Sequence, residues 1–183
     1  MTRGSLPRMR LVLTVGLSSV LALALQVSPA LAGGHGDNYL HPITIKPFSC
    51  CTVMTAKSNA TPATTQAGEP APTFGSGQGF GDRGCVPNEN NVAQTIWLTF
   101  TPSTTAAYIA STVGSNYDSV LTIYTFDGTN FTEIGCNDDT SDTDTASQLD
   151  LSLTAGTTYY FQVSTFNGNP FNPANLAFTL EFD

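Results

Sequence analysis

Hydrophobic and polar residues alternate along the second half of the chain in short runs, which turn residues separate. The run from Gln148 to Thr154 alternates most regularly, with leucines on one face and Asp150, Ser152 and Thr154 on the other. A period of two residues is typical of a half-buried antiparallel strand. Runs rich in β-branched and aromatic residues predict further strands at 42–48, 95–100, 107–113, 119–126, 131–136, 159–166 and 176–182.

Turn signals between these runs favour an all-β fold. Asp127-Gly128-Thr129-Asn130 lies between two predicted strands and is typical of a hairpin. A helical period is not sustained anywhere after residue 33, so we predict an antiparallel β-sandwich of jelly-roll type with about 7–9 strands. Tyr159 follows a turn at Gly156, which fits either a tyrosine corner or an ordinary core tyrosine.

The first 32 residues have the pattern of a signal peptide. Arg3, Arg8 and Arg10 form a basic start, an apolar run spans 11–25, and a small-residue ending closes at Ala32. The apolar run is shorter than the ~20 residues that a membrane-spanning helix needs. We therefore expect a signal peptide at 1–32, an N-terminal extension with one strand at 33–56, a sandwich domain at 57–183, and a secreted product without a membrane span.

Charge and cysteine content fit an extracellular protein. All 14 acidic residues follow residue 32, against only Lys46, Lys57 and Arg83 as basic residues. Such a surface disfavours nucleic acid as a partner and suits hard cations. Four cysteines in an oxidising compartment predict disulfides, and four allow three pairings. We expect Cys85 to pair with Cys136, because both flank strands at one end of a sandwich; the partners of Cys50 and Cys51 stay open.

The region from Trp97 to Phe166 resembles the bacterial pre-peptidase C-terminal (PPC-like) domain family of secreted β-sandwich modules. The matching pieces are "TIWLTFTP", "STVGSNYDSVLTIYTFDG", "IGCNDD" and "LTAGTTYYFQVSTFNG", in the family's order and spacing. The resemblance covers roughly residues 57–183. It implies a non-catalytic module, because the family is not known for catalysis, and some relatives bind calcium or collagen.

Residues that would support catalysis are sparse. The two histidines after residue 32, His35 and His41, both lie in the N-terminal tail, away from the predicted sandwich. The chain contains neither a G-x-S-x-G nor an H-E-x-x-H motif. We therefore predict no catalytic residues. The alternative is a small secreted hydrolase of the glycosidase kind that uses a pair of carboxylates.

The segment "GCNDDTSDTD" is the strongest candidate site. Asp138, Asp139, Asp142 and Asp144 lie close together in sequence, and calcium takes six to eight oxygen ligands from such groups. The segment does not follow the EF-hand spacing, so the alternatives are a calcium site of another kind or a solvated acidic turn. Asp138 and Asp139 carry most of the calcium hypothesis, because they match the paired aspartates of the family. No cofactor besides calcium is expected.

Asp118, Glu69 and Trp97 are further candidates for a specific role. Asp118 precedes a predicted strand and is expected to bond to turn amides, and Glu69 is expected to act in a similar way. Trp97 is out of phase with its apolar neighbours, which fits either a core position or an exposed aromatic platform for sugars. The predicted function is extracellular binding or adhesion, with polysaccharide, protein or other cell-surface material as the partner.

Overall fold

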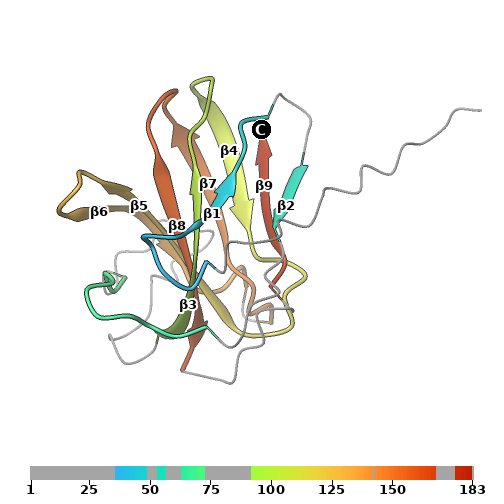
Figure 1. Ribbon diagram of the computed structural model, residues 1–183. Helices are drawn as coiled ribbons and strands as arrows, with labels where there is room; N and C mark the ends of the chain where they lie inside the picture. The colour runs from blue at the N-terminus through green and yellow to red at the C-terminus, as the bar shows by residue number, and fades with distance from the viewer. Residues whose placement is uncertain are drawn as a thin grey trace, which may run out of the picture.

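The computed structural model describes residues 36–48, 53–56, 63–72, 92–141, 143–167 and 176–182 (Figure 1). Nine strands and no helix are found within these residues. The strands are β1 (Ile43–Ile45), β2 (Val53–Ala56), β3 (Val92–Phe100), β4 (Ala106–Ser111), β5 (Ser119–Phe126), β6 (Phe131–Asn137), β7 (Gln148–Leu153), β8 (Tyr159–Phe166) and β9 (Phe178–Phe182). All eight predicted strands are present, and β2 is an addition that the sequence pattern did not indicate.

The strands form two packed sheets, which confirms the β-sandwich. One sheet has the order β1-β3-β8-β5-β6 and the other β2-β9-β4-β7. From β2 to β9, successive strands alternate between the sheets except at the β5–β6 hairpin, which is the connectivity of a jelly roll. The hairpin turn forms as predicted, because Asp127 accepts hydrogen bonds from the amides of Thr129 and Asn130.

Two features of the N-terminal segment differ from the prediction. β1 pairs with β3 in parallel, so the five-stranded sheet is not purely antiparallel. β2 pairs with β9 in the other sheet. The segment at 33–56 therefore contributes one strand to each sheet.

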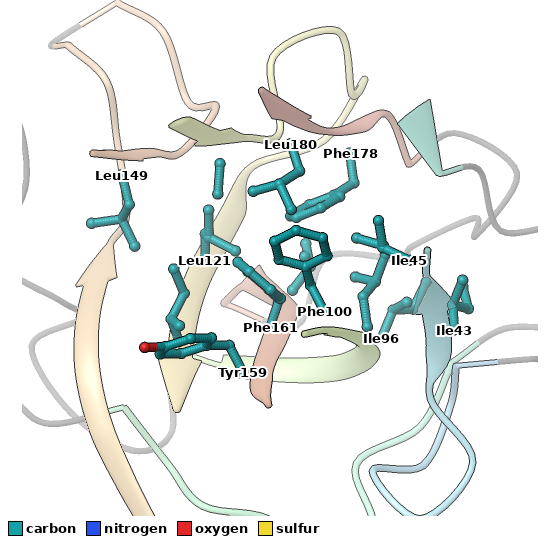
Figure 2. Close-up of a cluster of buried hydrophobic side chains, with 14 of the residues drawn as sticks. Ile43, Ile45, Ile96, Phe100, Leu121, Leu149, Tyr159, Phe161, Phe178 and Leu180 are labelled. Carbon is teal, nitrogen blue, oxygen red and sulfur yellow. The ribbon is translucent and has the colours of Figure 1, made fainter. Parts of the chain in front are cut away.

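The main core lies between the sheets. Figure 2 shows Phe178 and Leu180 of β9 facing Phe100 and Phe161 of the opposite sheet. The rings of Phe161 and Phe178 lie 5.4 Å apart in an edge-to-face arrangement. The alternation predicted for β7 is confirmed, since its leucines are buried and Asp150 and Ser152 are exposed.

The outer face of the five-stranded sheet is also buried. Trp97, Thr122, Tyr124 and Gln162 are at most 2% exposed although they point away from the core between the sheets. Tyr39 packs against Trp97, and the Gln162 side-chain amide donates a hydrogen bond to the carbonyl of Pro70. Segments 36–42 and 63–72 therefore form a partial third layer over this sheet.

This layer resolves the alternatives for Trp97. The side chain faces out of the sandwich, as its phase in the strand predicted, yet it is completely buried. Trp97 is therefore a core residue and not an exposed platform.

Tyr159 forms the tyrosine corner, because its hydroxyl accepts a hydrogen bond of 2.9 Å from the backbone amide of Thr154. We predict that Tyr159→Phe lowers the free energy of unfolding by about 1 kcal/mol, since the amide loses its partner. Chemical denaturation measures the loss. Tyr160→Phe is the matched control, because its ring is partly exposed and its hydroxyl has no hydrogen bond to a described residue. Equal effects from the two changes would contradict a special role for the corner.

Candidate functional site

The candidate site lies at the end of the sandwich where β5 begins and β6 ends. The two strands are antiparallel, and Leu121 pairs with Asn137. Asp118 just before β5 and Asp138 just after β6 are therefore brought to the same end of the sheet. The β4–β5 loop (112–118) and the β6–β7 loop (138–147) form this end together.

Three carboxylates meet there. Asp118, Asp138 and Asp139 each offer a carboxylate oxygen, and these oxygens all lie within 4.8 Å of one another. All three residues are half-buried. The structure thus brings together two of the predicted metal ligands, Asp138 and Asp139, and adds Asp118, which sequence reasoning had assigned to another role.

Of the other two predicted ligands, Asp144 does not join this cluster. Asp144 is exposed, and one of its carboxylate oxygens accepts a hydrogen bond of 3.1 Å from the amide of Ala146. It stabilises the local turn and is not one of the three carboxylates that meet in the cluster. Asp142 lies outside the described residues.

Buried hydroxyl groups hold the two loops together. Thr112, Ser119 and Ser147 are each 0% exposed. Thr112 and Ser147 form three hydrogen bonds with each other. The Thr112 amide and hydroxyl donate to the Ser147 carbonyl at 2.9 and 3.3 Å, and the Ser147 amide donates to the Thr112 hydroxyl at 2.7 Å. The Thr112 and Ser119 hydroxyls are also hydrogen-bonded, at 2.7 Å. We call these three residues, together with Asn137, the loop clamp.

The loop clamp also fixes the backbone that carries the aspartates. The Asn137 side chain is fully buried, donates to the carbonyl of Asp139 at 3.1 Å, and accepts from the amide of Gln148 at 2.9 Å. The Ser147 hydroxyl lies 2.7 Å from the carbonyl of Asp138. The positions of Asp138 and Asp139 are therefore set by buried polar contacts before any ligand arrives.

The environment of Asp118 favours its neutral form. Burial raises the pKa of its carboxyl group, and the negative charge of Asp139 raises it further. One carboxylate oxygen of Asp118 is buried and has no hydrogen-bond partner. The predicted bonds from Asp118 to turn amides are not found among the described residues, so that prediction is wrong.

The arrangement suits a hard cation. Calcium binds oxygens at 2.3–2.6 Å, so two ligands on opposite sides of the ion lie about 5 Å apart. Three carboxylate oxygens within 4.8 Å of one another satisfy this limit. The cluster contains no histidine or cysteine, the ligands that zinc and copper favour. Water and backbone carbonyl groups would complete the coordination shell.

A hollow that is open to solvent lies between the two loops at this end of the sandwich, and it is lined by Val113, Thr140, Asp144 and Gln148. Only one of these residues is acidic. His41 is exposed before β1, and His35 lies outside the described residues.

Cys136 lies on the outer face of the five-stranded sheet, 1% exposed and packed against Val120. It is disulfide-bonded, so its sulfur carries no proton and the Thr122 hydroxyl, 3.3 Å away, is the donor between them. Cys50, Cys51 and Cys85 lie outside the described residues. The pairing of Cys85 with Cys136 therefore stays a prediction.

A scan against models of known protein families and a search of curated proteins both find no match to this chain. Within the residues that the structure describes, there is no helix with the length and apolar character needed to cross a membrane.

We predict that Thr112→Val lowers the free energy of unfolding by about 1–3 kcal/mol, because the substitution keeps the shape of the side chain and leaves the buried Ser147 amide without its acceptor. Thr132→Val on β6 is the matched control, since Thr132 is exposed in a strand and its substitution should change stability by less than about 0.5 kcal/mol. Denaturant titration of both variants measures the difference. Similar stabilities for the two variants would mean that the loop clamp does not hold the loops.

Proposed function

We propose that this chain is a secreted, non-catalytic β-sandwich module that binds material outside the cell, and that calcium stabilises its loop end. The observation that carries the proposal is the group of Asp118, Asp138 and Asp139 carboxylates within 4.8 Å of one another on two clamped loops. A rigid sandwich that presents loops at one end is a common arrangement for extracellular recognition.

Sequence features support the extracellular setting. The first 32 residues have the pattern of a signal peptide, and the remaining chain is strongly acidic. The resemblance to the PPC-like family adds support, because "IGCNDD" places Asp138 and Asp139 where that family has paired aspartates. The jelly-roll connectivity is in keeping with this resemblance.

The alternative of a carboxylate-dependent hydrolase has less support. A retaining glycosidase holds two carboxyl groups about 5–5.5 Å apart across a cleft that receives the sugar. Here three carboxylates gather more closely, on loops at the end of the sandwich. Such a group repels itself when it is charged, and a cation relieves that repulsion better than a neutral sugar does.

Calcium should raise the melting temperature of the protein. With a dissociation constant on the order of 10⁻³ M, 10 mM calcium stabilises the folded state by about 1.4 kcal/mol. For a chain of this size the melting temperature then rises by about 3–6 °C. Magnesium should raise it less, because it requires a tighter octahedral shell. Differential scanning calorimetry in chelator, calcium and magnesium measures these effects.

Three variants test the ligand assignment in the same experiment. Asp118→Asn alone and Asp138→Asn combined with Asp139→Asn should each abolish the rise, and each should slightly stabilise the calcium-free protein by removing like charge. Asp150→Asn is the matched control, because Asp150 is exposed on β7, outside the cluster, and should keep the full rise. The metal proposal is wrong if the melting temperature is the same in chelator and in 10 mM calcium.

Binding to extracellular material should depend on the same loop end. We expect the protein to be retained by at least one surface among insoluble polysaccharides, collagen and cell-wall fractions, and to be released by a chelator. Pull-down assays with the wild-type protein and the Asp118→Asn variant measure this retention. Retention by none of these surfaces would contradict the binding role and leave a purely structural one.

A further inference from the structure

Residues 63–72 cross the outer face of the five-stranded sheet, and we call this segment the strap. Ala63 and Pro72, at its two ends, are buried. Between them, the Gln162 side-chain amide donates to the Pro70 carbonyl at 3.1 Å, and the Thr95 hydroxyl lies 3.1 Å from the Thr64 carbonyl. The strap is therefore attached to both β8 and β3, and its Glu69 lies near Trp97 and Tyr124 of this face.

Glu69 anchors the middle of the strap through a half-buried carboxyl group. One of its oxygens accepts a hydrogen bond from the Thr95 hydroxyl on β3, at 2.5 Å. The other oxygen is buried and has no hydrogen-bond partner. The indole N–H of Trp97 lies close enough to lower the pKa of this carboxyl group, yet it does not form a hydrogen bond of normal geometry. The prediction that Glu69 acts as a turn residue thus missed its main contact.

The charged groups around Glu69 are acidic. Asp37 accepts hydrogen bonds from the amide and hydroxyl of Thr64 at the start of the strap, and its negative charge acts on Glu69. Tyr124 on β5 feels the charges of both Glu69 and Glu133 of β6. The neighbours from β3 and β8 are Thr95, Trp97 and Gln162, which do not titrate. No lysine, arginine or histidine of the described residues is among the groups that act on Glu69.

We propose that the strap is a pH-sensitive cover over the Trp97 face, which is docked when the Glu69 carboxyl group is protonated and loosens when it is charged. A charged Glu69 is held under the strap with the Thr95 hydroxyl and the Gln66 backbone amide as donors, one oxygen without a normal hydrogen bond, and the acidic Asp37 nearby; burial outweighs these donors. Opening the strap exposes the charged carboxylate to water, which removes this cost. Protonation removes the cost without opening, so the docked strap binds the proton more tightly than the open one does.

The direction of the pH dependence follows from this difference. Burial is the main cause that raises the pKa of Glu69 above its ordinary value of 4.5 when the strap is docked. The stability of the docked state is therefore fully present below pH 4.5 and is lost as the pH rises through the raised pKa. A difference of one unit between the pKa of Glu69 in the docked form and in the open form changes the docking equilibrium tenfold. A fluorescence experiment resolves a change of about this size.

Trp97 reports directly on the strap, because it is the only tryptophan in the chain and is 0% exposed. We expect acrylamide quenching of its fluorescence, measured in chelator from pH 4 to pH 8, to be weak in acid and to increase with pH. Glu69→Gln should keep the quenching weak at every pH, since the amide has the shape of the acid and carries no charge. Asp150→Asn should behave like the wild-type protein, because Asp150 is exposed on the other sheet.

A second variant tests the proposal if Glu69→Gln does not fold. The Thr95 hydroxyl bond lowers the pKa of Glu69, so Thr95→Val should move the midpoint of the quenching curve to higher pH. Asp118→Asn should leave the midpoint unchanged, which separates this proposal from the one on calcium. Three results would overturn the proposal. The quenching of the wild-type protein could stay constant from pH 4 to pH 8, or the quenching of Glu69→Gln could increase with pH as much as that of the wild-type protein. The third is a quenching curve of Thr95→Val with the same midpoint as the wild-type curve.

Discussion

Three carboxylates lie within 4.8 Å of one another and repel each other when they are charged. The structure of the loop end depends on the contacts that hold them together against this repulsion. The free-energy cost of charging these groups together is reflected in Asp118, whose pKa is raised by burial and by the charge of Asp139. The buried hydroxyls of Thr112, Ser119 and Ser147 and the amide of Asn137 bind the two loops so firmly that the aspartates stay close. A bound cation would turn this repulsion into attraction without moving the backbone.

The same five-stranded sheet positions both features that we connect with function. Its central strands β3, β5 and β8 are mostly buried on both faces, by the other sheet on one side and by segments 36–42 and 63–72 on the other. Asp118 and Asp138 lie at the ends of β5 and β6, while Glu69 contacts the outer face at β3. A metal at the loop end and a proton at the strap would therefore act on one rigid element at two separate places.

The sequence pattern predicted most of the fold. Alternation and turn residues located eight of the nine strands, and the Tyr159 corner could be named because its motif is local. β2 was missed because only four residues form it. The parallel pairing of β1 with β3 could not be predicted, since a short strand carries no signal for its partner. The burial of Trp97 involves the covering segments 36–42 and 63–72, which have no hydrophobic period.

The candidate site was predicted in part, for a physical reason. Asp138 and Asp139 are adjacent, so a pattern of neighbouring residues in the sequence identifies them. Asp118 lies near them only because β5 pairs with β6. A signal was available: Asp118 directly precedes the first strand of a recognisable hairpin, and Asp138 directly follows the second. Asp144 was included on sequence proximity alone, and the turn at Ala146 draws its side chain into a local hydrogen bond instead.

Calorimetric titration of the protein with calcium, at pH 7 and again at pH 5, tests the central claim most directly. The account predicts weak binding at pH 7, with a dissociation constant on the order of 10⁻⁴–10⁻³ M. The affinity should fall as the pH is lowered, and binding should release protons, because calcium binds the charged form of Asp118 and burial and Asp139 raise the pKa of that carboxyl group. Absence of binding at pH 7, or binding of equal affinity in the Asp118→Asn variant, would contradict it.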